Sequence, residues 1–139
     1  MSGYDIAILG AIGPVFGDYY QTLTTLSECI TREGIFIIDD GYIEDASDFT
    51  HSLMLSKKIM LQQIQKAGTE LVEDVIMDRN QIKVADDFIF EKLKTRCHEL
   101  ISIHPEKKNL FLNYIQVQEK ETNVLENKVI CSTMVINRK

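Results

Sequence analysis

Two short, almost continuous apolar runs stand near the start of the chain, at Ile6–Leu9 and Ile35–Ile38, with a helical pattern between them. Runs of this kind, alternating with helices, indicate parallel strands that are covered on both faces. The pattern therefore predicts an α/β fold in which Asp5–Gly10 and Gly34–Asp39 are adjacent parallel strands of one sheet, joined by a single helix.

The rest of the hydrophobic pattern gives the bounds of this helix and predicts four more segments. The predicted elements are a first helix from Asp18 to about Ile30 that ends at Arg32–Gly34, a helix from about Leu53 to Ala67 with Leu55, Ile59, Ile64 and Ala67 on one face, a strand at Glu70–Met77, a charged helical block at 78–127, and a last strand at Lys128–Ile136. Within the block, Asp86 and Asp87 are expected to start one helix and Pro105 another, since a proline fits the first helical position. The last strand is expected to lie antiparallel beside Glu70–Met77.

Composition places the chain among small single-domain proteins. Its 139 residues are 45% apolar, enough for one domain, 1–139, with one core. The net charge is −6, from 15 basic and 21 acidic residues. Phosphate backbones are bound by clustered Lys and Arg, so a nucleic acid is not expected as the main partner.

The cysteines and the apolar segments indicate a reduced, soluble protein. Cys29, Cys97 and Cys131 are far apart and form neither a disulfide framework nor a zinc-binding spacing, so no metal is expected. The N-terminal apolar run is too short for a signal peptide, and no segment approaches the roughly 20 apolar residues of a membrane span. We therefore expect a cytoplasmic location and no membrane partner.

Glycines and acids gather where the two N-terminal strands end. The first strand opens into GAIGPVFG, where Pro14 is expected to stiffen the loop, and the second ends in Asp39 and Asp40. Ligands of open parallel sheets bind outside the carboxyl ends of the strands, so this edge is predicted to bind a small molecule. Successive strand side chains point to opposite faces, so one of the two acids should face the cleft. It would orient a substrate hydroxyl or amine or act as general base; the alternative is a turn into Gly41.

The segment YDIAILGAIGPVFGDYYQTLTTLSECITREGIFIIDDGYI resembles the fourth strand, following helix and fifth strand of a class I (Rossmann-like) S-adenosylmethionine-dependent methyltransferase. ENKVICSTMVINRK resembles the last, antiparallel strand of that family. The resemblance covers nearly the whole chain but only the C-terminal half of the family's fold. It implies a partial sheet in the strand order 4-5-7-6. Residues 78–127 depart from the family, whose simplest members have a short connection here, and form a helical insertion before the last strand. That insertion would be a lid on the substrate side or, equally, a cover for an apolar surface or a dimer contact.

The resemblance also implies a site for S-adenosylmethionine and roles for individual residues. The backbone after the first strand would lie against the methionine part of the cofactor, at Leu9, Gly10, Ala11 and Gly13. Side chains of the following loop and helix would surround the methyl group or its acceptor, with weaker candidates further along: Val15, Phe16, Tyr19, Tyr20, Tyr42 and His51. The alternative for Tyr19 is packing of the helix on the sheet. The methyl acceptor is expected to be a small molecule.

The chain departs from the family in having no G-x-G-x-x-G motif and no acidic residue placed to bind the ribose. We therefore expect this chain alone to bind the cofactor weakly or not at all. An apolar first strand at a sheet edge would recruit the missing N-terminal half, form a homo-oligomer, or aggregate. Two alternatives remain open. The first is a noncatalytic α/β interaction or regulatory subunit derived from this fold. The second is another α/β enzyme with GAIGPVFG as its phosphate loop, and it ranks lower because the loop lacks the Lys and Ser/Thr of a P-loop.

Overall fold

The computed structural model describes residues 3–13 and 15–139, so Pro14 and its expected role lie outside the described residues. The chain divides into two compact units. One contains the residues up to Met77 together with Val129–Lys139, and the other is Asp78–Lys128.

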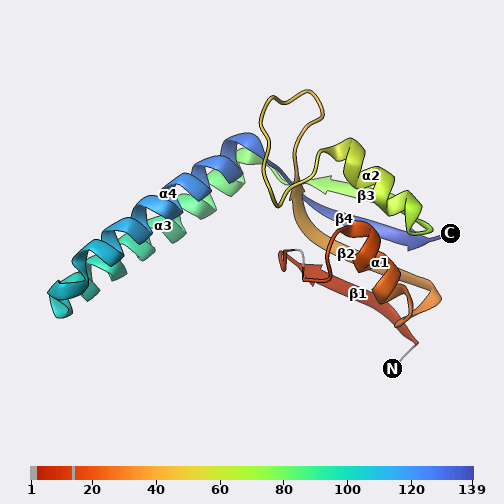
Figure 1. Cartoon of the computed structure of the whole chain (residues 1–139), viewed down its shortest axis with the longest axis horizontal. Helices are drawn as coiled ribbons and strands as arrows, with labels where there is room; N and C mark the ends of the chain where they lie inside the picture. Colours follow the sequence, from red (N-terminus) through yellow and green to blue (C-terminus); the bar gives the residue numbers. More distant parts are fainter. Residues whose placement is uncertain (1–2, 14) are drawn as a thin grey trace. The chain divides into compact units, whose positions relative to one another are not determined.

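The first unit contains a four-stranded sheet in the order β1-β2-β4-β3 (Figure 1). Its strands are β1 (Tyr4–Gly10), β2 (Ile30–Tyr42), β3 (Thr69–Ile76) and β4 (Ile130–Arg138). Strands β1 and β2 are parallel, and β4 is antiparallel to both β2 and β3. The predicted pairing of the two N-terminal strands and the antiparallel last strand are both confirmed.

Helices α1 (Tyr19–Ser27) and α2 (Lys57–Lys66) cover one face of this sheet (Figure 1). Alternate residues of the strands bury their side chains against these helices, as a two-residue period requires. The buried cluster consists of Leu9, Leu23, Ile30, Phe36, Ile38, Tyr42, Met60, Ile64, Met134 and Ile136. The intervening residues of β1 lie on the opposite face, where Ile6 and Ile8 are exposed, Ile8 by 74%.

The first helix is shorter than predicted. Asp18 is its N-cap, accepting a hydrogen bond from the Gln21 N–H at 2.8 Å, but the helix ends at Ser27 and Ile30 already belongs to β2. Ile30 is buried in the core, so an apolar residue at helical spacing serves the strand instead. Arg32–Gly34 consequently lies within β2, where the pairing with β1 shifts register, and is not a helix end.

The second helix starts four residues later than predicted, because Ser56 caps it by accepting from the Ile59 N–H. Met60 and Ile64 form its buried face, whereas Ile59 is exposed. Of the predicted face, Ile64 is buried and Leu55 and Ala67 pack against the core, so the prediction is wrong only for Ile59, whose place is taken by Met60.

The second unit is a helical hairpin made of α3 (Arg79–Ile103), a 3₁₀ turn η1 (Pro105–Lys107) and α4 (Lys108–Lys128). Asp78 caps α3 by accepting from the Asn80 and Gln81 N–H groups, so Asp86 and Asp87 lie inside the helix rather than at its start. Pro105 is the first residue of the turn that leads into α4. None of the described helices is long and apolar enough to span a bilayer.

Candidate functional site

The end of β1 and the end of β2 are held side by side at the carboxyl edge of the sheet. Gly10 is paired with Asp39, and the Ala11 N–H donates a hydrogen bond to the Asp39 carbonyl oxygen at 2.8 Å. The loop that follows β1 therefore starts next to the two acids of β2. This brings the predicted glycine loop and the predicted carboxylates to one place.

The backbone of this loop has positive φ angles close to the end of β1. Ala11 has a φ of 48° and Gly13 a φ of 64°. A residue with a Cβ is strained in the left-handed region, and such strain is concentrated at functional loops. Leu9, directly before, is buried in the core and fixes the end of the strand.

Gly10 has an ordinary backbone, and a Cβ added to it would meet no atom of the described residues within 4 Å. Neither conformation nor internal packing thus requires glycine at this position. A glycine of this kind leaves room for a group that is not part of the chain to approach the backbone closely.

Asp39 and Asp40 point to opposite faces of the sheet. Asp40 shares the face of the buried Phe36 and Ile38; its Oδ2 accepts from the Tyr19 hydroxyl at 2.8 Å, and its Oδ1 from the Gly41 N–H at 2.8 Å. Asp39 is exposed on the other face, and its Oδ1 accepts from the Thr133 hydroxyl at 3.4 Å. Both oxygens of Asp40 are engaged inside the unit, whereas Asp39 is open to an external group.

Tyr19 joins α1 to two other elements. Its N–H donates to Gln63 Oε1 of α2 at 3.0 Å, while its hydroxyl reaches Asp40 at the end of β2. Burial, followed by the negative charge of Asp40 and the hydrogen bond to it, raises the pKa of Tyr19 far above its ordinary value. Tyr19 is therefore a neutral hydrogen-bond donor that holds Asp40 in place.

Two further aromatic residues, Tyr20 and Phe16, lie near the start of α1. The Lys66 ammonium lies 4.5 Å from the centre of the Tyr20 ring, a cation–π contact between α1 and α2. Phe16 lies in the loop before α1 and is substantially exposed. Phe16 thus remains available to contact an external molecule.

Tyr42 takes part in a separate polar cluster on the helix side of the sheet. Its hydroxyl donates to Asp74 Oδ2 at 2.9 Å; the Lys57 ammonium lies 2.9 Å from the same oxygen, and the Ser132 hydroxyl donates to Asp74 Oδ1. Burial raises the pKa of Tyr42, and the hydrogen bond to Asp74 raises it further. The cluster links β2, β3, β4 and α2 through one carboxylate.

The charges of this cluster stabilise one another. Burial alone would raise the pKa of Asp74, but the hydrogen bonds from Ser132, Lys57 and Tyr42 bring it below its ordinary value. The hydrogen bond to Asp74 raises the pKa of Lys57. The Tyr42 hydroxyl is thus engaged inside the unit, whereas the Asp39 carboxylate is exposed and has one contact there, with the Thr133 hydroxyl.

His51 lies in the segment between β2 and α2. Its Nδ1 accepts from the Leu53 N–H at 3.1 Å, and its ring stacks on Phe49 with ring centres 6.3 Å apart. Both contacts are local to that segment. Among the described residues, no three His, Cys, Asp or Glu side chains are grouped so as to bind a metal ion.

Two residues at the site were not predicted from the sequence. Thr133 faces Asp39 because β4 pairs with β2 in the register that places these two residues opposite one another. Gln63 reaches the first N–H of α1 from the neighbouring helix. The last strand was predicted from the sequence, so a prediction of its pairing register with the Asp39 strand would also have placed Thr133 opposite Asp39. No feature of the sequence pattern indicates a role for Gln63.

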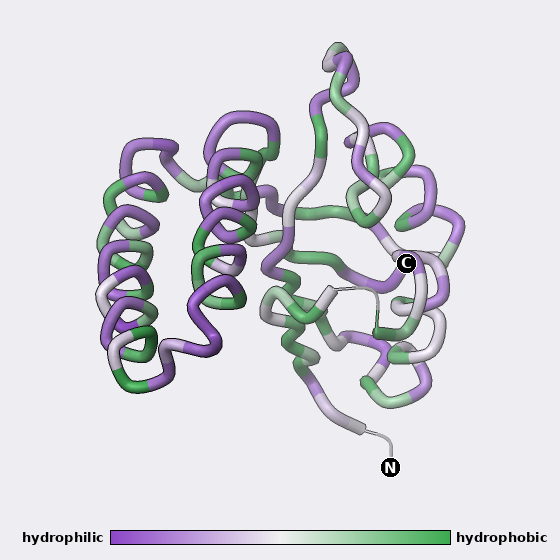
Figure 2. The backbone as a smooth tube through the Cα atoms, turned by 60° about the vertical axis from the view of Figure 1, so that its left-hand side comes forward, coloured by the Kyte–Doolittle hydropathy of each residue, from purple (hydrophilic) through white to green (hydrophobic). Residues whose placement is uncertain are grey.

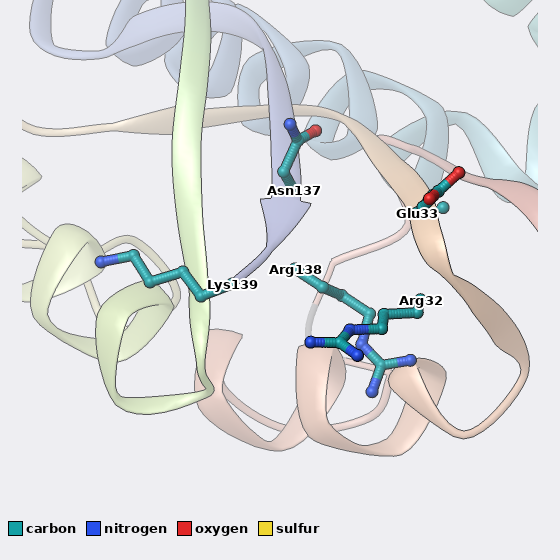
Figure 3. Close-up of a pocket in the computed structure, with 6 residues that line it drawn as sticks. Arg32, Glu33, Asn137, Arg138 and Lys139 are labelled. Atoms are coloured by element: carbon teal, nitrogen blue, oxygen red, sulfur yellow. The ribbon is translucent and has the colours of Figure 1, made fainter.

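A separate pocket of about 430 Å³ lies where β2 begins and β4 ends (Figure 3). Its lining residues are Arg32, Glu33, Gly34, Asn137, Arg138 and Lys139. The Arg138 guanidinium donates to the Ser27 and Ile30 carbonyl oxygens, at 3.2 and 3.4 Å, and thereby caps the end of α1. These contacts give Arg138 a structural role at the edge opposite the candidate site.

Comparisons with known proteins identify the fold. No family model and no curated protein matches the chain. Solved structures match it with TM-scores near 0.75: an S-adenosylmethionine-dependent methyltransferase from Thiobacillus denitrificans in complex with S-adenosyl-L-homocysteine (TM-score 0.74, 13% identity), a putative sarcosine dimethylglycine methyltransferase from Galdieria sulphuraria (0.74, 14%) and a cyclopropane synthase from Mycobacterium tuberculosis (0.75, 10%).

These matches cover 99, 99 and 97% of this chain but only 59, 54 and 55% of the three known chains, in the same order. This chain thus spans somewhat more than half the length of the proteins it resembles. At such low identities the likeness shows the fold alone. The chain has part of a class I methyltransferase fold, which confirms the predicted α/β class and the predicted strand order.

Proposed function

We propose that this chain is part of an S-adenosylmethionine-dependent methyltransferase that acts on a small molecule. The observation that carries the proposal is the carboxyl edge of the sheet, where Gly10 and Ala11 lie beside Asp39 in a sheet of methyltransferase order. In agreement with this, the Thiobacillus denitrificans protein of the same fold was solved with S-adenosyl-L-homocysteine. We take residues 1–139 as one domain in which 78–127 form an insertion.

The chain's own residues fit a cofactor at this edge. Space beside Gly10 is open, Ala11 is held in a strained conformation, and no internal contact accounts for glycine at position 10. We assign the backbone of Leu9, Gly10, Ala11 and Gly13 to the methionine part of S-adenosylmethionine. When bound, this cofactor supplies a methyl group that is already activated, so the protein mainly aligns the acceptor and excludes water.

Asp39 is the better of the two acids for contact with the acceptor. S-adenosylmethionine would supply the methyl group to an acceptor nitrogen or oxygen, and the acceptor would have to lose a proton. The exposed Asp39 carboxylate would receive that proton or orient the group that carries it, while Thr133 holds one of its oxygens. Asp40 would instead hold α1 on the sheet through Tyr19.

Phe16, Tyr19 and Tyr20 are assigned to the wall beside the reacting group. Phe16 is the most exposed of them and so the one best able to contact an acceptor directly. We assign no contact with the acceptor to Tyr42 and His51, because their hydrogen bonds are made within their own cluster and segment.

The outer edge of β1 is proposed to pair with a further polypeptide segment. Within the described sheet β1 pairs only with β2, so its other edge offers N–H and C=O groups. Exposed Ile6 and Ile8 add an apolar face beside that edge. We expect the segment to be the N-terminal half of the fold, carrying the glycine-rich loop; a second copy of β1 is the alternative.

Titration calorimetry with S-adenosyl-L-homocysteine tests the proposal. Residues 1–139 alone should bind weakly or not at all, while the chain extended by the residues encoded immediately upstream should bind with a dissociation constant in the micromolar range. Micromolar binding to residues 1–139 alone would show that no further segment is needed. If the extended chain also fails to bind S-adenosyl-L-homocysteine, the proposal that it is a methyltransferase is rejected.

The second candidate is a noncatalytic interaction or regulatory subunit. It is favoured by the same exposed edge and apolar face of β1, which suit a protein partner as well as a missing half. An extended chain that folds and binds a protein partner but no S-adenosyl-L-homocysteine would support it.

A further inference from the structure

The helical hairpin carries an apolar groove on one side. The groove has a volume of about 460 Å³ and lies between α3 and α4. Its lining residues are Leu93, Arg96, Cys97, Leu100, Leu110, Phe111 and Tyr114. Among the described residues of the hairpin helices only Cys97 is fully buried, so the two helices alone do not enclose a core.

The residues of this side recur with heptad spacing on both helices. On α3 the positions are Ile89, Leu93, Arg96, Leu100 and Ile103, and on α4 they are Leu110, Tyr114, Val117, Glu121 and Val124. Steps of four and three residues are those of helices that pack side by side in bundles. Figure 2 shows hydrophobic segments recurring along both helices. Leu110 and Ile103 are each 63% exposed, so the two stripes are largely uncovered within the unit.

We propose that this face binds the same face of a second copy of the chain, so that two hairpins form a four-helix bundle. The helices have 25 and 21 residues, which makes them about 38 and 31 Å long. Two such helices side by side present a face on the order of 600 Å², close to the roughly 800 Å² that each partner contributes to a stable interface. The area is thus of the size that a dimer needs.

The one charged residue in each stripe favours an antiparallel pairing of the copies. Arg96 lies seven residues before the end of α3, about 11 Å from the tip, and Glu121 lies thirteen residues after the start of α4, about 20 Å from it. When two hairpins overlap along their whole length with tips at opposite ends, Arg96 of one copy comes level with Glu121 of the other. The two charges are then complementary within the bundle.

Within one copy these two side chains have only exposed local contacts. The Arg96 guanidinium forms an ion pair with Glu99 at 2.8 Å, and the Glu121 carboxylate accepts from Gln118 at 2.7 Å. Exposed pairs of this kind contribute little to stability, so their exchange for an intermolecular pair costs little. A lid against the chain's own site, in contrast, requires no complementarity between Arg96 and Glu121.

Sedimentation equilibrium of the full chain across the micromolar range tests this dimer. Wild type should be a dimer, and Leu110→Glu should weaken its dissociation constant at least tenfold. Arg96→Glu should also weaken it, and Arg96→Glu combined with Glu121→Arg should restore it. Val84→Glu is the matched control, because Val84 is 71% exposed on the same hairpin but outside both stripes; it should leave the dimer unchanged.

The results separate this dimer from the alternatives. Circular dichroism establishes that each variant keeps its helices, and the charge exchange gives a result that unfolding cannot imitate. A monomeric wild type would overturn the proposal, because the chain would then not self-associate. A dimer that is lost in Ile8→Glu but kept in Leu110→Glu and Arg96→Glu would also overturn it, because the copies would then pair through β1. Failure of the double variant to restore the dimer would overturn the antiparallel pairing. None of these results depends on binding of S-adenosyl-L-homocysteine, so they are independent of the proposed function.

Discussion

The Tyr19 hydroxyl donates a hydrogen bond to Asp40 Oδ2 at 2.8 Å, so the first residue of α1 is joined to the carboxyl end of β2. This contact separates the roles of two adjacent acids. Asp40 is held inside the unit by α1, and Asp39, on the other face of the strand, is left open at the candidate site.

Tyr19→Phe tests the contribution of this contact to stability. Loss of the hydroxyl leaves a half-buried carboxylate oxygen without its donor, which should lower the free energy of unfolding by about 1–2 kcal/mol. Urea unfolding followed by circular dichroism measures it. Tyr20→Phe is the control at the adjacent position, since its ring contact with Lys66 survives the substitution. Equal losses in the two variants would contradict the role given to Tyr19.

The two acids should respond differently to replacement by asparagine. In the chain extended to bind S-adenosylmethionine, Asp39→Asn should lower turnover by about 100-fold, the lower range for a group that moves a proton, with little change in melting temperature. Asp40→Asn should lower the melting temperature, because the charged acceptor of the Tyr19 hydroxyl is lost. Formation of S-adenosyl-L-homocysteine with a panel of small amines and hydroxyl compounds provides the assay. A larger loss of turnover in Asp40→Asn at equal stability would reverse the assignment.

The sequence was sufficient to predict the strands and their pairing, because Ile6–Leu9 and Ile35–Ile38 are almost continuous apolar runs with a helical pattern between them. The expected cover on both faces is wrong for β1, since Ile6 and Ile8 are exposed. It did not predict where α1 ends. Ile30 fits both the helical spacing and the strand, and packing in the core decides for the strand. Similarly, the helical block was predicted from residue 78, but its first helix was predicted to start at Asp86 and Asp87, whereas α3 starts directly after Asp78.

The site was predictable as a location but not as a geometry. Asp39 and Asp40 were placed at a strand end by the apolar residues before them. The acid that stays open to solvent is set by which alternate residues of the strand pack against the helices, either Phe36 and Ile38 or Ile35 and Ile37. Because both pairs are apolar, the sequence pattern does not decide between them, and the tertiary packing does.

The cluster around Asp74 should make stability depend on pH at both extremes. The pKa of Asp74 is lowered from 3.8, so its contribution is present above that value and is lost as pH falls through the folded-state pKa. The pKa of Lys57 is raised from 10.5, so its contribution is present below that value and is lost as pH rises through the folded-state pKa. The free energy of unfolding contributed by the pair should therefore be constant between these limits.

Asp74→Asn should lower stability at neutral pH and flatten its decrease in acid. The measurement is urea unfolding from pH 2.5 to 7, conditions chosen to span the ordinary pKa of a carboxyl group near 4. Asp87→Asn is the control, because its pair with Lys83 is exposed on the hairpin and should contribute little. An unchanged acid dependence in Asp74→Asn would show that the cluster does not stabilise the fold through its charges.

Gly10 provides the sharpest separation of binding from folding. A Cβ at this position meets nothing within 4 Å in the part of the chain that the structure describes, so Gly10→Ala should leave the free energy of unfolding unchanged or raise it by up to about 1 kcal/mol. In the extended chain the alanine methyl group would occupy space that the cofactor needs, and the larger valine side chain would occupy more of it. The affinity for S-adenosyl-L-homocysteine should therefore fall at least tenfold in Gly10→Ala and further in Gly10→Val. Gly34→Ala is the opposite case, because its Cβ would lie 3.1 Å from the Asp5 carbonyl oxygen and should destabilise the fold. Calorimetric titration with matched unfolding curves gives both quantities. Undiminished affinity in Gly10→Val would show that the cofactor does not lie against the end of β1.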